Sequence, residues 1–163
     1  MAKASMKAAG QVSALALDTL ERAVLAAPVA AFAEAAREPA ARARWAELAA
    51  AIDALEVPAP LLEQFGALVE AALTSGRVRR EHGPGAELSL RALYLKTPRG
   101  RAAAEAVEAL NAALSEFAGR PLDAVSVAIR GPGAWALTLQ SARARIVVRF
   151  AHDGVQAESV ELG

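Results

Sequence analysis

The chain has 163 residues, and its 18 basic and 18 acidic side chains give a formal net charge of zero. A general nucleic-acid-binding protein usually carries a clear basic excess, so this class is not expected. The sequence contains no cysteine, which excludes thiol catalysis, thiolate metal sites and a disulfide scaffold.

Alanine inflates the hydrophobic fraction of 55% and is the best helix former. The abundance of Ala, Arg, Gly, Val and Leu is typical of a GC-rich bacterial genome. No apolar run approaches the ~20 residues that a transmembrane helix needs. Asp18, Glu21 and Arg22 interrupt the apolar N-terminal run before any signal-peptide cleavage site. These features predict a soluble, cytoplasmic protein.

The first expected element is a helix over residues 3–26. An apolar stripe at roughly helical spacing runs along it: Val12, Leu15, Leu20 and Val24. Pro28 is expected to end this helix, and a short alanine-rich helix to follow over 29–37. Alanine-rich helices have little side-chain bulk to bury alone. The four stripe residues are therefore candidates for docking against a partner helix.

Two further helices are expected before Gly76, which is a suitable helix stop. The first extends over about 39–55, with an apolar face of Trp45, Leu48, Ile52 and Leu55. The stretch 56–60 contains two prolines and breaks the helical pattern. The second helix covers about 60–74.

Residues 77–96 are the least regular part of the chain. Residues 77–85 form a turn-rich, basic stretch, and 88–94 fit either a strand or a helix, because their apolar periodicity does not separate the two. A long helix then follows over 97–118, with Thr97 as its N-cap and Pro98 at its first position. The apolar stripe of this helix consists of Val107, Leu110, Leu114 and Phe117.

From Leu122 onward the hydrophobic period changes to two, and tight turns separate four short strands. The strands have one apolar face, which the helix over 97–118 is expected to cover. The predicted fold is therefore α+β: a helical N-terminal half followed by a long helix packed on a four-stranded antiparallel β-meander. Either the chain is one continuous domain, or a boundary near Gly76–Gly85 divides a helical module, 1–76, from a module of linker, helix and sheet, 77–163.

Few residues suit catalysis. His82 and His152 are the two histidines. Each is expected in a glycine-bounded turn. His152 is followed by Asp153, but adjacent side chains seldom point the same way and the turn already explains this aspartate, so neither histidine is expected to be a catalytic base. Metal-ligand spacings, phosphate-binding glycine loops and nucleophile elbows do not occur. We expect no catalytic residue, no metal, no cofactor and no enzymatic activity.

Charge is segregated along the chain. Residues 45–76 contain acidic but no basic side chains, whereas 77–101 are mainly basic. The two segments either complement each other within the fold or bind a partner of opposite sign. Arginines on the polar face of the sheet can form cross-strand ion pairs, discourage aggregation or bind an anion. The candidate patch for an anion or an acidic partner consists of Arg77, Arg79, Arg80, Arg143, Arg145 and Arg149.

The two helices of 45–74, joined by a proline-containing turn and followed by Gly76–Glu81 and a glycine-rich tip, resemble a winged helix-turn-helix. The piece Leu93–Arg101 is similar to the end of the wing and the start of the next helix in MarR-type regulators. The resemblance implies DNA binding with 77–101 as the wing. It departs at the recognition helix, because 61–73 contain no Arg or Lys to contact phosphates and base edges.

We expect a non-enzymatic protein-interaction or assembly subunit that binds a protein partner or a second copy of the chain. One alternative is a winged-helix DNA-binding regulator, although nucleic acid is the less expected partner. The other is a binder of a small apolar ligand, with its pocket between the long helix and the sheet.

Overall fold

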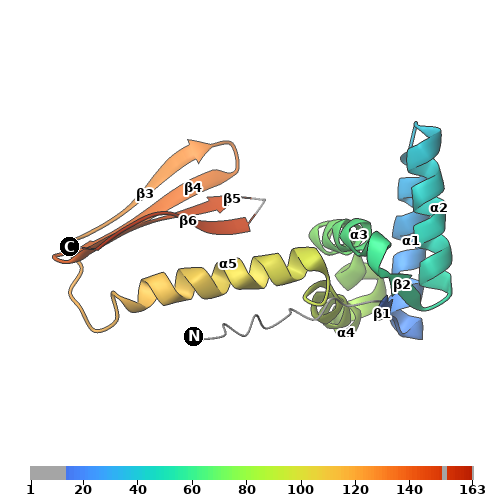
Figure 1. Cartoon of the computed structure of the whole chain (residues 1–163), viewed down its shortest axis with the longest axis horizontal. Coiled ribbons are helices and arrows are strands. Elements are labelled where there is room, and N and C mark those ends of the chain that lie inside the picture. The colour runs from blue at the N-terminus through green and yellow to red at the C-terminus, as the bar shows by residue number, and fades with distance from the viewer. Residues whose placement is uncertain (1–13, 152–153, 163) are drawn as a thin grey trace, which may run out of the picture. The chain divides into compact units, whose positions relative to one another are not determined.

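The computed structural model describes residues 14–151 and 154–162. The chain divides after Arg99 into two compact units. The first is mainly helical, and the second combines a helix with a four-stranded antiparallel sheet (Figure 1). This arrangement confirms the predicted α+β fold. In the described part of the chain, no helix is both long and apolar enough to cross a membrane.

The first unit begins with a short strand rather than with the predicted helix. Its elements are β1 (Ala14–Ala16), α1 (Thr19–Ala35), α2 (Pro39–Asp53), β2 (Glu56–Pro58), the 3-10 turn η1 (Ala59–Leu61), α3 (Leu62–Thr74) and α4 (Arg77–Tyr94). Strands β1 and β2 pair antiparallel, with Leu15 opposite Val57. The prediction of a helix over 3–26 is therefore wrong for residues 14–18, and its part before residue 14 lies outside the described residues.

A capping box explains why α1 begins at Thr19. The Asp18 carboxylate accepts a hydrogen bond of 2.7 Å from the Glu21 backbone N–H, and Glu21 Oε2 accepts one of 2.9 Å from the Asp18 N–H. These two bonds satisfy donors that the first turn of a helix leaves free. The backbone of Asp18 is extended, with φ −94° and ψ 173°, so the helix cannot continue backward through it.

Pro28 lies inside α1 and does not end it, which corrects the predicted break and the separate helix over 29–37. Because proline has no N–H, the Val24 carbonyl loses its helical donor, and an interior proline costs a helix ~3 kcal/mol. Val24, Leu25 and Val29 are buried on both sides of the proline. Their packing offsets that cost.

Residues 77–94 are helical. The prediction of a turn-rich stretch over 77–85 is therefore wrong except at Gly83, and 88–94 form a helix rather than a strand. Gly83 interrupts α4 with φ 85° and ψ 174°, a conformation that only glycine adopts readily. The segment that the winged-helix resemblance assigns to a wing therefore forms two helical pieces around a glycine break. The expectation of a β-wing is wrong for residues 77–94.

The core of the first unit joins α4 to the helices before it. The predicted face of α2 is confirmed, because Leu48 and Ile52 are buried and Trp45 and Leu55 pack against the same cluster. The buried residues of α4 belong to that cluster as well: Val78, Ala86, Leu90 and Leu93. This shared core is why the first compact unit extends to Arg99 rather than to Gly76.

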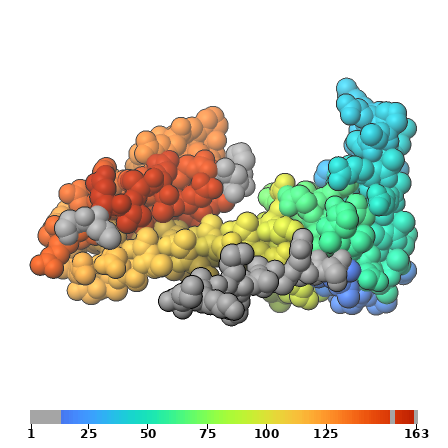
Figure 2. Space-filling view, viewed as in Figure 1, coloured from blue at the N-terminus to red at the C-terminus, as the bar shows by residue number. Residues whose placement is uncertain are grey.

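The second unit contains α5 (Pro98–Ser115), whose first two residues precede the division, and the strands β3 (Ala124–Gly131), β4 (Ala134–Ser141), β5 (Ala144–Ala151) and β6 (Gly154–Leu162). The strands pair antiparallel in the order β3-β4-β5-β6, which confirms the meander. Leu110 of α5 forms a buried cluster with Ile146 and Val148 of β5. In the space-filling view, the yellow helix and the orange-to-red sheet lie against each other (Figure 2).

Candidate functional site

The apolar face of the sheet consists of three rows of side chains that run across the strands. Residues directly opposite in antiparallel strands share a face. The rows are Ile129, Trp135, Phe150 and Val155; Val127, Leu137, Val148 and Ala157; and Val125, Leu139, Ile146 and Val160. The period of two in the sequence therefore places these side chains together on one surface.

Helix α5 covers only part of this surface. Its residues pack over the middle of the sheet, on Ile146 and Val148 and the neighbouring Leu137, Leu139 and Val155. A helix is ~10–12 Å wide, whereas four strands at ~4.8 Å spacing are wider. The prediction that the helix covers the apolar face is confirmed at the centre of the sheet and fails at its β3 side.

Large apolar side chains remain exposed where the helix does not reach. We call this surface the apolar corner, and it consists of Val125, Val127, Ile129, Trp135 and Phe150, which are between 42% and 79% exposed. The three residues of β3 form one column, and Trp135 and Phe150 continue the row that begins at Ile129. The corner is therefore one continuous surface rather than scattered residues.

Strand β3 forms an edge of the sheet and lacks the usual protection of edge strands. Natural edges carry charged side chains or proline that prevent pairing with other chains. Between Ala124 and Ile129 the strand has neither. Arg145 and Glu161 are opposite each other in β5 and β6, on the face away from the apolar rows, and pair at 3.6 Å. Arg130, near the end of β3, pairs with Glu158 at 3.0 Å.

The predicted docking stripe of the first helix does not form one surface. Leu15 and Val24 are buried in the core of the first unit, whereas Leu20 is exposed. Val12 lies outside the described residues. Leu15 is held in β1 and Val24 in α1, so the helical spacing that grouped these residues does not apply.

The predicted arginine patch is divided between the two units. Arg79 pairs with Glu87 at 3.5 Å, and Arg80 is exposed beside it on α4. Arg143, Arg145 and Arg149 belong to the β4–β5 turn and β5 in the second unit. Arg77 does not join either group, because it lines a pocket in the first unit.

The acidic and basic segments complement each other at Arg99. Its Nε donates to Glu63 Oε1 at 2.7 Å and its Nη1 to Glu70 Oε2 at 2.9 Å, which joins the start of α5 to α3. Hydrogen bonds to these two carboxylates raise the pKa of Arg99 above its usual value. One basic residue of 77–101 is therefore neutralised within the fold.

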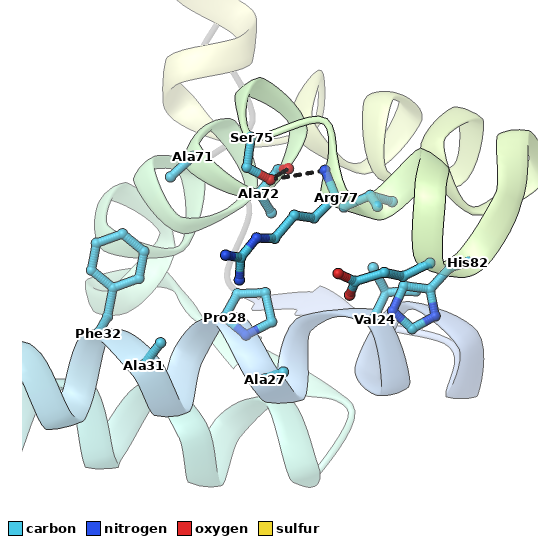
Figure 3. Close-up of a pocket in the computed structure, with 12 residues that line it drawn as sticks. Val24, Ala27, Pro28, Ala31, Phe32, Ala71, Ala72, Ser75, Arg77 and His82 are labelled. Atoms are coloured by element: carbon cyan, nitrogen blue, oxygen red, sulfur yellow. Dashed lines mark hydrogen bonds between the residues drawn. The ribbon is translucent and has the colours of Figure 1, made fainter.

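A pocket of about 320 Å³ lies among α1, α3 and α4 (Figure 3). Its floor is mainly alkyl, with Ala27, Pro28 and Ala31 from α1 and Ala71 and Ala72 from α3. The ring of Phe32, also at the pocket, stacks on Trp45 with the centroids 4.8 Å apart. This pocket lies among helices of the first unit, whereas the predicted ligand pocket was placed between the long helix and the sheet.

The ionisable side chains of this pocket come from the first piece of α4, and they are Arg77, Glu81 and His82. Ser75, at the end of α3, is a further polar residue of the lining. In the described part of the chain, no cluster of three or more His, Asp or Glu side chains is arranged to hold a metal ion. The pocket thus combines an apolar floor with one guanidinium, one carboxylate and one imidazole.

Comparison with known proteins adds no homologue. No family model matches this chain, and no curated protein or solved structure is significantly similar to it. The geometry of the apolar corner and of the pocket therefore carries the functional conclusions.

Proposed function

We propose that this protein is a non-enzymatic assembly subunit that associates with a second copy of itself through the apolar corner. The observation that carries the proposal is the continuous exposed surface of Val125, Val127, Ile129, Trp135 and Phe150 beside an edge strand. Contiguous apolar surfaces of this kind mark interaction sites in soluble proteins. Trp is also among the residues that contribute most to binding at interfaces.

A second copy suits this surface because the corner carries no charge. Across a twofold axis each residue of the patch meets the same patch of the partner, so like charges would oppose each other if any were present. Arg145, Arg149 and Glu161 lie on the other face of the sheet. Burying the corner in a dimer removes apolar surface from water, which stabilises the dimer by ~25 cal/mol for each Å² buried.

Two neighbouring substitutions in β3 test this proposal. Val127 and Ser126 are both exposed but lie on opposite faces of the strand. Val127→Lys places a charge in the corner, whereas Ser126→Lys adds the same charge to the polar face. We expect Val127→Lys to be monomeric and Ser126→Lys to remain dimeric by size-exclusion chromatography with light scattering. Equal masses for the two variants would contradict the assignment of the interface.

A further inference from the structure

The pocket among α1, α3 and α4 has the size and lining of a small-molecule site. Its volume of about 320 Å³ falls within the ~300–1,000 Å³ typical of ligand pockets, which are mostly apolar with a few placed polar groups. The alanines of α1 and α3 leave this space open because their side chains are short. Pro28 adds an apolar ring to the floor and, lacking an N–H, removes a donor from it (Figure 3).

The pocket holds two opposite charges that do not neutralise each other. Arg77 and Glu81 are separated by one helical turn, a spacing at which such side chains commonly form an ion pair. No ion pair or side-chain hydrogen bond of either residue occurs among the described residues. In Figure 3 the Arg77 side chain extends from the start of α4 into the pocket, toward α1. A hydrogen bond of 3.1 Å from the Arg77 N–H to Ser75 Oγ fixes the backbone at the start of α4.

We propose that this pocket binds an apolar α-amino acid as its zwitterion. The carboxylate of the ligand pairs with the Arg77 guanidinium, its ammonium group pairs with the Glu81 carboxylate, and its side chain lies on the floor of alanines and Pro28. A simple anion leaves Glu81 unpaired, and a simple cation leaves Arg77 unpaired. Both side chains are exposed to solvent, so a zwitterion is favoured because it gains a charge-assisted contact with each of them, whereas a singly charged ligand gains one. The volume corresponds to roughly ten water molecules at ~30 Å³ each, which is enough for one amino acid.

Three probes with the same alkyl chain separate the two charge contacts: L-leucine, 4-methylpentanoate and 3-methylbutylamine. The first has both charges, the second only the carboxylate and the third only the ammonium group. Binding to the full chain is measured by isothermal titration calorimetry and by NMR shifts of the His82 ring. We expect leucine to bind about tenfold or more tightly than either single-charge probe, because each lacks one charge-assisted hydrogen bond.

Substitutions assign each contact to its residue. In the Arg77→Gln variant, leucine should bind no more tightly than 3-methylbutylamine, because the contact to the carboxylate is lost. In the Glu81→Gln variant, leucine should bind no more tightly than 4-methylpentanoate, because the contact to the ammonium group is lost. Arg80→Gln serves as the matched control, because Arg80 is exposed on α4 and does not line the pocket. This variant should bind leucine like the wild type. The proposal is overturned if no probe binds, if the acid or the amine binds as tightly as leucine, or if Arg80→Gln weakens binding as much as Arg77→Gln. Because the pocket lies within the first unit, these results are independent of the apolar corner.

Discussion

The Ser89 hydroxyl of α4 donates a hydrogen bond of 3.0 Å to Oε1 of Glu21 in α1. The other carboxylate oxygen of Glu21 caps the backbone N–H of Asp18 at 2.9 Å. Glu21 is almost fully buried, with 8% exposure, so both bonds compensate for the removal of its charge from water. One carboxylate therefore fixes the start of α1 and attaches it to a helix 68 residues further along the chain.

Ser89→Ala should lower the free energy of unfolding of the first unit by about 1.5 kcal/mol, because it leaves a buried carboxylate one donor short. The measurement is urea unfolding followed by tryptophan fluorescence. Of the two tryptophans, Trp45 lies in the first unit and Trp135 in the second. A Trp135→Phe background therefore reports on the first unit alone. Thr74→Ala removes an exposed local hydrogen bond within the same unit and should change stability by less than about 0.5 kcal/mol. Similar losses for both variants would mean that Glu21 does not depend on Ser89.

Two helical glycines should respond oppositely to alanine. At Gly85 a Cβ atom meets nothing within 4 Å, so Gly85→Ala should stabilise the first unit by about 0.5–1 kcal/mol through lower chain entropy. At Gly66 a Cβ atom lies 3.1 Å from Thr97 Oγ1 and 3.2 Å from Arg99 Cδ. Thr97 is fully buried and has little room to move. Gly66→Ala should therefore destabilise by about 1 kcal/mol. Stabilisation by both variants in thermal unfolding would show that the contact between α3 and Thr97 is loose.

Because of Tyr94, the free energy of unfolding of the first unit should fall as the pH rises above 10. Burial, and next the negative charge of Glu70, raise its pKa above the usual 10.0. The folded protein therefore holds this proton more tightly than the unfolded chain. The resulting stabilisation is complete below pH 10 and is lost as the pH rises through the raised pKa. Because Tyr94 is the chain's single tyrosine, an absorbance titration of tyrosinate measures this pKa directly.

Glu70→Gln should lower the pKa of Tyr94, since it removes the second cause of the shift, and Glu47→Gln on α2 should leave it unchanged. Tyr94→Phe should remove the tyrosine's part of the stability loss above pH 10. A tyrosine that titrates at its ordinary pKa in the folded protein would show that its hydroxyl is solvated.

The sequence predicts most helices and all four strands of the meander, because each has a regular apolar face. Val125, Val127 and Ile129 alternate with polar or small residues, and this pattern is sufficient to identify a strand. The start of α1 at Thr19 is consistent with the sequence, because Asp18 and Glu21 have the spacing of a capping box. The predicted helix over 3–26 misses this start, because it follows the longer apolar stripe instead.

Other features depend on tertiary contacts that a local pattern does not contain. Helix α1 runs through Pro28 because the neighbours of this proline are buried. Pro84 follows the break at Gly83, and proline is well suited to the first turn of the helical piece that begins there. The pocket needs side chains from α1, α3 and α4 together. Exposure of Val127 depends on how far α5 reaches across the sheet, although the order of a meander already places β3 at an edge.

Sedimentation equilibrium of the wild-type chain over a dilution series tests the central claim most directly. The proposed association through the apolar corner predicts a mass that approaches twice the chain's 16.8 kDa at high concentration and falls toward the monomer on dilution, with little dependence on salt because the corner is uncharged. A mass that remains at the monomer value throughout the series would contradict self-association. So would a dimer that dissociates when salt is added, because charged groups would then hold it together.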